Sequence, residues 1–135
     1  MAKKINEIEG IGPVTAEKLG KAGVTTVEGL LEAGASKSGR KKISQESGLD
    51  EGKVLDLVNM ADLFRIKGIG SQFSELLKVA GVDTVKELRN RNADNLHAKL
   101  VEVQAEKNIT RVVPALSVVQ GFIDQAKELP PVVTY

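Results

Sequence analysis

One short stretch of this chain occurs twice, and this repeat constrains the fold more than any other feature of the sequence. Residues 8–19, which contain Gly10-Ile11-Gly12, are followed 58 positions later by residues 66–77, which contain Gly68-Ile69-Gly70. A repeat on this scale indicates a structural unit that the chain uses more than once. Glycine permits a positive φ angle and a close backbone approach, whereas the isoleucine between the glycines suits a hydrophobic core. Each copy therefore predicts a short helix, a tight turn and a second helix.

The register of the repeat extends beyond the glycine turns. Residues 22–27 (Ala-Gly-Val-Thr-Thr-Val) align with residues 80–85 (Ala-Gly-Val-Asp-Thr-Val). A glycine just past the end of a helix is a common terminator, because it adopts the left-handed conformation without strain. In the first copy, Thr25 or Thr26 is a suitable N-cap for the next helix. The pattern predicts a third helix in each copy.

The remainder of each unit is more divergent. Residues 35–39 predict a loop, and a basic helix that begins at Arg40 is expected to end at Gly48. Asp50 is expected to cap the longer helix that follows. In the second copy, Asp94 is expected to cap a helix that extends to about residue 108. Proline residues at positions 130 and 131 are expected to end the last helix.

The composition fits small helices that pack through aliphatic side chains. The 135 residues are enough for one ordinary domain or two small ones, and only 3% of them are aromatic. The core must therefore consist mainly of Ile, Val, Leu and Ala. We expect an all-α fold with two tandem units, residues 1–62 and 63–131, of about five short helices each. Residues 132–135 are expected to form a tail that docks or frays.

The charge and the cysteine count limit the possible partners. The net charge is +1, from 19 basic and 18 acidic residues, so any attraction to nucleic acid must come from a local patch. The absence of cysteine excludes disulfides and thiolate metal sites. The chain lacks an apolar leader segment, and no apolar run approaches the roughly 18–20 residues that span a bilayer. We expect a cytoplasmic location and no membrane partner.

No arrangement of residues predicts an enzyme. His97 is the single histidine, and neither a cysteine nor a pair of carboxylates stands near it in the sequence. A metal-binding or catalytic role for His97 is therefore not expected. The chain also lacks a nucleophile–base arrangement, a paired-acid site and a phosphate-binding loop of the nucleotide-hydrolase type. We expect no catalytic residues, no metal and no cofactor.

The two glycine turns resemble those of the helix-hairpin-helix superfamily, and each 58-residue unit resembles its tandem form. The layout is similar to that of the N-terminal domain of RadA-type recombinases, the C-terminal domain of the RNA polymerase alpha subunit and the repeats of the elongation factor NusA. Two such units in succession also resemble a bacterial family of tandem helix-hairpin-helix proteins of unknown function. The resemblance covers nearly all of the chain and is strongest at residues 5–34 and 63–92. Such a resemblance is stronger evidence for a fold than for a function, because one fold can serve many functions.

The resemblance also implies a site. In the superfamily, backbone amides of the hairpin bind a phosphate, and the dipole of the following helix adds favourable charge. Carried over to this chain, the donors come from Gly68, Gly70 and Gln72 of the second hairpin, around Ile69. In the first hairpin they come from Gly10, Gly12 and Val14. Such contacts carry no base information, so binding is expected to be independent of sequence and sensitive to salt.

The two hairpins differ in their charged neighbours. DNA-binding members of the superfamily commonly carry Lys or Arg two residues after the second glycine, where this chain has Val14 and Gln72. Glu7 and Glu9 flank the first hairpin and would repel a phosphate. The second hairpin has basic neighbours instead: Arg65, Lys67 and Lys78. If one hairpin contacts nucleic acid, we expect it to be the second.

Further basic residues are weaker candidates, because charges of this kind are more often solvated surface than part of a binding site. They are Arg40, Lys41, Lys42, Lys53, Arg89 and Arg91. Two hypotheses about function follow from the sequence. The first is a non-catalytic module that binds the DNA or RNA backbone through the second hairpin. The second is a protein-interaction or assembly module in which the hairpins are structural.

Overall fold

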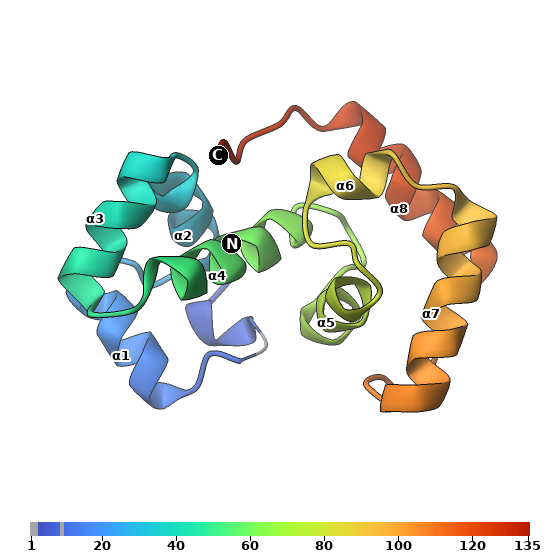
Figure 1. Ribbon diagram of the computed structural model, residues 1–135, viewed down its shortest axis with the longest axis horizontal. Helices are drawn as coiled ribbons and strands as arrows, with labels where there is room; N and C mark the ends of the chain where they lie inside the picture. Colours follow the sequence, from blue (N-terminus) through green and yellow to red (C-terminus); the bar gives the residue numbers. More distant parts are fainter. Residues whose placement is uncertain (1–2, 9) are drawn as a thin grey trace. The chain divides into compact units, whose positions relative to one another are not determined.

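The computed structural model describes residues 3–8 and 10–135, and it confirms the predicted all-α fold (Figure 1). Within these residues, β pairing is limited to an isolated antiparallel bridge between Lys4 and Thr26. The chain divides into two compact units. The first unit contains Met1–Asp62 together with Val132–Tyr135, and the second contains Leu63–Pro131. The last four residues therefore belong to the first unit, although the second unit precedes them in the chain.

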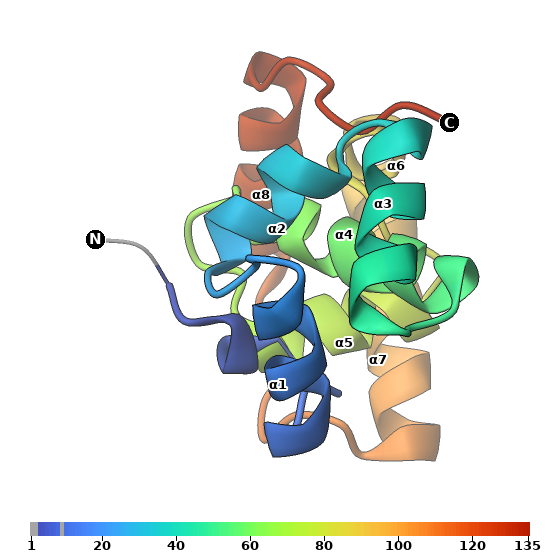
Figure 2. The ribbon, with the colours of Figure 1, turned by 90° about the vertical axis from the view of Figure 1, so that its left-hand side faces the viewer.

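The first unit packs four α-helices and a 3-10 turn around an aliphatic core. Its elements are η1 (Ile5–Glu7), α1 (Pro13–Lys21), α2 (Val27–Gly34), α3 (Lys37–Ser47) and α4 (Glu51–Leu63). Helix α3 packs against both α1 and α2, as Figure 2 shows from the side of this unit. The buried hydrophobic side chains are mainly aliphatic and include Ile5, Ile8, Ile11, Leu19, Val24, Val27, Leu30, Ile43, Val54, Leu57 and Val58. Four polar or charged residues of this unit are also buried: Arg40, Ser47, Asn59 and Asp62.

The second unit is built from the helices α5 (Ser71–Val79), α6 (Val85–Arg89), α7 (Ala93–Lys107) and α8 (Leu116–Glu128). Helix α8 packs against α6 and α7, and α7 also contacts α5. One hydrophobic core joins these helices, and Leu76, Leu88, Leu100 and Phe122 are among its buried members. Burying the apolar faces of such short helices supplies most of their stability, since isolated helices of this length are marginal in water.

The repeat in the sequence is also a repeat of backbone geometry. Gly10 and Gly68 both have positive φ, +91° and +97°, which side-chain-bearing residues rarely adopt. In each hairpin the amide of the central isoleucine, Ile11 or Ile69, donates to the carbonyl three residues earlier at 3.2 Å. Both isoleucines are buried. The predicted positive φ is confirmed for the first glycine of each hairpin, and the predicted burial of the isoleucine is confirmed in both copies. The second glycines, Gly12 and Gly70, have negative φ, -91° and -112°.

The ends of the hairpin helices also repeat. Gly23 and Gly81 follow α1 and α5 with φ of +78° and +97°. Thr26 and Thr84 then cap α2 and α6, and their hydroxyls accept from the amide three residues later at 2.9 and 3.0 Å. Of the two threonines considered for the first cap, the structure selects Thr26. Local terminator and capping signals therefore identify this part of the fold correctly.

Two predicted helix boundaries are wrong. Residues 35–39 do not form a loop throughout, because the Ser36 hydroxyl caps α3 by accepting from the amide three residues later at 3.1 Å. Asp94 is not the cap of α7. The Asn92 side chain performs that role and accepts from Asn95 N at 3.1 Å, so Asp94 lies in the first turn. Ser and Asn are as effective as Asp at this position, and the sequence offered several adjacent candidates.

Candidate functional site

The second hairpin places a set of unpaired backbone donors at the start of α5. Among the described residues, no acceptor bonds to the amides of Gly70, Ser71 and Gln72, as is usual for the first residues of a helix. These three residues and Phe73 line a hollow of about 300 Å³. An anion at this position would meet N–H groups and the positive end of the helix dipole.

The second hairpin is fixed to α8 by polar and apolar contacts. The Gln125 side chain accepts from the backbone N–H of Lys67 at 2.9 Å and donates to the Lys67 carbonyl at 3.2 Å. A Cβ atom added to Gly68 would lie 3.0 Å from the Phe122 ring. The Phe122 ring also packs against Phe73, with ring centroids 6.3 Å apart. These contacts hold the hairpin in one conformation, so its free amides are already positioned before any ligand binds.

The three basic residues predicted near this hairpin are not equally placed. Lys67 is exposed and belongs to the hairpin itself. The Arg65 guanidinium donates to the carbonyl of Pro130 at 2.7 Å. Lys78 is exposed but stands in the last turn of α5, about 10 Å along the helix axis from Ser71 at the usual rise per residue. Of the predicted trio, Lys67 alone is both exposed and part of the hairpin.

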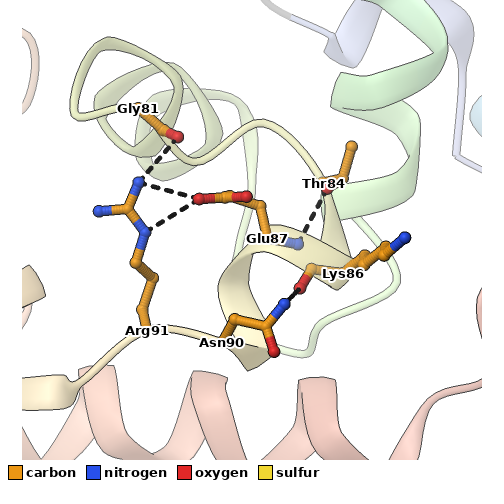
Figure 3. Close-up of polar contacts among 6 residues, drawn as sticks. All are labelled: Gly81, Thr84, Lys86, Glu87, Asn90 and Arg91. Carbon is orange, nitrogen blue, oxygen red and sulfur yellow. Dashed lines mark hydrogen bonds and ion pairs between the residues drawn. The ribbon is translucent and has the colours of Figure 1, made fainter.

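Arg89 and Arg91 bind the protein's own backbone. Arg89 donates to the carbonyl of Lys127 near the end of α8 at 2.9 Å. Arg91 bonds to the carboxylate of Glu87 at 3.1 Å and to the carbonyl of Gly81 at 3.1 Å. Figure 3 shows this guanidinium between Glu87 and Gly81. Both side chains therefore have a structural partner in the second unit.

The weaker basic candidates of the first unit separate into buried and exposed residues. Arg40 is only 5% exposed, and its guanidinium donates to the carbonyls of Gly34, Ala35 and Thr134 at 2.9, 3.0 and 2.6 Å. Its donors are bonded to backbone carbonyls of the chain, so they are not available to a phosphate in this structure. Lys41 and Lys42 are exposed on α3.

The first hairpin has fewer free amides but a cation that sequence reasoning did not assign to it. Pro13 occupies the first position of α1, where the second hairpin has Ser71, so one N–H is missing. The ammonium of Lys53 on α4 lies 3.9 Å from the position of a Cβ on Gly10. Gly12 is exposed, and so is Val14, at 66%. No local pattern links residues 10 and 53, which meet only in the folded unit.

Of the two acidic residues that flank the first hairpin, the structure describes Glu7. The Glu7 carboxylate accepts from the amide of Lys4 at 2.9 Å and is exposed. Glu9, the other acidic neighbour named from the sequence, lies outside the described residues. The charge contrast between the hairpins is therefore smaller than the sequence predicts, since Lys53 stands beside Gly10.

Over residues 3–8 and 10–135, no group of three or more His, Cys, Asp or Glu side chains is arranged to hold a metal ion. His97 is half-buried on α7. In that same range, no helix has both the length and the apolar character that crossing a membrane requires.

The fold and the repeated hairpins define an all-α protein with two similar halves. The chain belongs to a family described as a domain of unknown function (DUF4332), whose profile matches residues 9–129 and therefore includes both hairpins. No curated protein and no solved structure matches the chain. Family membership thus defines the class of domain, and the functional argument depends on the geometry of the hairpins.

Proposed function

We propose that this protein is a non-catalytic module that binds the phosphate backbone of DNA or RNA through the second hairpin. The observation that carries the proposal is the set of unpaired amides at Gly70, Ser71 and Gln72, in the same hairpin as the exposed Lys67. Amides at a helix start are favourable donors to phosphate oxygens. The resemblance of both turns to helix-hairpin-helix motifs supports the same site. Contacts of this kind position a backbone and do not distinguish bases.

A titration against oligonucleotides tests this function. The full chain is mixed with labelled duplex DNA, single-stranded DNA and RNA at several salt concentrations, and fluorescence anisotropy is recorded. We expect weak binding that falls steeply as salt rises and differs little between sequences, because phosphate contacts release counterions. Absence of binding to every oligonucleotide at the lowest salt concentration would contradict the proposal.

The Ser71→Pro variant tests the amides themselves. Proline lacks the N–H group, and it is well tolerated at the first position of a helix, where Pro13 already stands in the first hairpin. We expect unchanged thermal stability and about tenfold weaker oligonucleotide binding, the usual effect of losing one hydrogen bond to a charged group. Affinity equal to that of the unmodified chain would show that this amide takes no part in binding.

The lysine contribution is tested by a matched pair of charge reversals. Lys67→Glu and Lys78→Glu change the net charge equally, but only Lys67 lies in the hairpin. We expect Lys67→Glu to weaken binding more than Lys78→Glu and to reduce the salt dependence of the affinity. Equal effects of the two variants would indicate general electrostatic attraction instead of a site at the hairpin.

One observation favours a second candidate function, a protein-interaction or assembly module. Arginine is the side chain best suited to bidentate phosphate contacts, and four arginines donate to carbonyls of the chain itself: Arg40, Arg65, Arg89 and Arg91. Light scattering over a range of concentrations tests this candidate. A stable dimer that persists in Lys67→Glu would support assembly, whereas a monomer that binds oligonucleotides would contradict it.

A further inference from the structure

The last residues of the chain are held on the first unit through their main chain. The amide of Thr134 donates to the carbonyl of Ala35 at 2.7 Å, and the carbonyl of Thr134 accepts from Arg40 at 2.6 Å. The Thr134 hydroxyl donates to the same Ala35 carbonyl at 3.3 Å. Recognition of both the N–H and the C=O of one residue is typical of a site that binds an extended segment.

The side chain of the following residue is recognised as well. The Tyr135 hydroxyl donates to the amide oxygen of Asn59 at 3.2 Å, and Asn59 is only 5% exposed. The Tyr135 ring lies 5.7 Å from the guanidinium carbon of Arg40, within the range of a cation–π interaction. A threonine followed by a tyrosine therefore meets a specific set of partners on α3 and α4.

The acceptor surface is built independently of the segment that occupies it. Arg40 also donates to the carbonyls of Gly34 and Ala35 at the end of α2, and these two bonds do not involve the segment. A hollow of about 250 Å³ lies beside the Tyr135 ring and is lined also by Lys37, Glu51, Gly52 and Leu55. Space for further contacts therefore lies next to the position of Tyr135, on the side of Arg40.

We propose that the tail groove, defined by Ala35, Arg40 and Asn59, is a docking site for an extended peptide segment and that Val132–Tyr135 is a releasable strap that fills it. The chain leaves the first unit at Asp62 and returns to it at Val132. Pro130-Pro131 keeps the preceding chain extended, which lowers the conformational entropy lost on docking. Release of the strap frees one donor of Arg40 and opens the groove.

A peptide of residues 129–135, labelled at its N-terminus, tests the groove in the full-length chain. The unmodified chain is compared with a variant that combines Thr134→Pro and Tyr135→Ala, which removes the Thr134 amide and hydroxyl donors and the Tyr135 ring and leaves every groove residue intact. We expect the variant to bind the peptide at least about tenfold more tightly, because the attached strap competes at a high effective concentration. Failure of the variant to bind, or equal binding by both chains, would overturn the proposal.

A substitution in the peptide, and not in the protein, tests the recognition of Tyr135 without any effect on the folding of the protein. A peptide with Tyr135→Ala lacks the ring and the hydroxyl, and we expect it to bind about tenfold more weakly or worse, as expected for losing a cation–π contact and a hydrogen bond. Equal affinity of the two peptides would overturn the proposed recognition.

A second readout uses the unmodified strap. Tyr135 is the single tyrosine and the chain has no tryptophan, so the intrinsic fluorescence of the protein reports on this ring. We expect the fluorescence anisotropy to fall in Arg40→Lys, which cannot reproduce the forked geometry of the guanidinium. We expect no change in Lys41→Ala, the exposed neighbour on α3. An unchanged anisotropy in Arg40→Lys would contradict the docking of the strap through Arg40.

Discussion

The two hairpins have nearly the same backbone and very different neighbours. Gly10 and Gly68 share a positive φ, but the nearest group to a Cβ on Gly10 is the flexible ammonium of Lys53, 3.9 Å away. At Gly68 the nearest group is the Phe122 ring, at 3.0 Å, and Gln125 holds the same turn through two hydrogen bonds. The comparison shows that the repeated Gly-Ile-Gly motif specifies the turn. The neighbours of the turn depend instead on the helix that packs against it, which is α4 at Gly10 and α8 at Gly68.

The largest expected difference between the hairpins concerns alanine at the first glycine of each. Gly10→Ala introduces only backbone strain, which we expect to lower the free energy of unfolding of its unit by about 1–2 kcal/mol. Gly68→Ala adds a clash with Phe122, which raises the expected loss to about 2–4 kcal/mol. Denaturant titrations that follow each unit provide the measurement. Equal losses would show that the packing of Phe122 on the second hairpin does not contribute.

A smaller effect is expected when the anchor of the second hairpin is removed. Gln125→Ala deletes both hydrogen bonds to the Lys67 backbone, and we expect a loss of about 1–2 kcal/mol with faster hydrogen exchange of the Lys67 amide. Gln120→Ala is the control, because Gln120 bonds only to Asp124 on the same exposed helix face. Unaltered exchange at Lys67 in Gln125→Ala would contradict the anchoring role of Gln125.

The smallest difference is expected where the two copies agree. Thr26 and Thr84 cap α2 and α6 with hydroxyl–amide distances of 2.9 and 3.0 Å. We expect Thr26→Ala and Thr84→Ala each to lower the free energy of unfolding by about 1 kcal/mol, the usual cost of a lost N-cap. If the two variants lost severalfold different amounts of unfolding free energy, the same cap geometry would not contribute the same stability in the two copies.

The parts of the fold that could be predicted depend on contacts between residues close in sequence. Three features could be predicted because their partners are only a few residues away: the hairpin turn at Gly68, the end of the helix at Gly23 and the N-cap at Thr26. The residue types at these positions are enough to identify each feature. The errors at residues 35–39 and at Asp94 arose where several good caps stand side by side, and local preference could not choose among them.

The parts that could not be predicted depend on residues far apart in sequence. Arg40 looked like the start of a basic surface, but its guanidinium is buried against carbonyls at positions 34, 35 and 134. Lys53 reaches the first hairpin from α4 without any pattern that links it to Gly10. Periodicity and capping rules describe one helix at a time, and they contain no information about which helices meet. The choice of the second hairpin as the phosphate site remains a prediction.

The most direct test of that choice is an amide chemical-shift titration of the full chain with a short oligonucleotide at low salt. The proposed site predicts that the amides of Gly70, Ser71 and Gln72 shift most and saturate together. The amides of Gly12 and Val14 in the first hairpin should shift less, because Pro13 leaves that hairpin one donor short. Saturable binding that leaves residues 70–72 unperturbed, or that perturbs Gly12 and Val14 more strongly, would contradict the assignment of phosphate binding to the second hairpin.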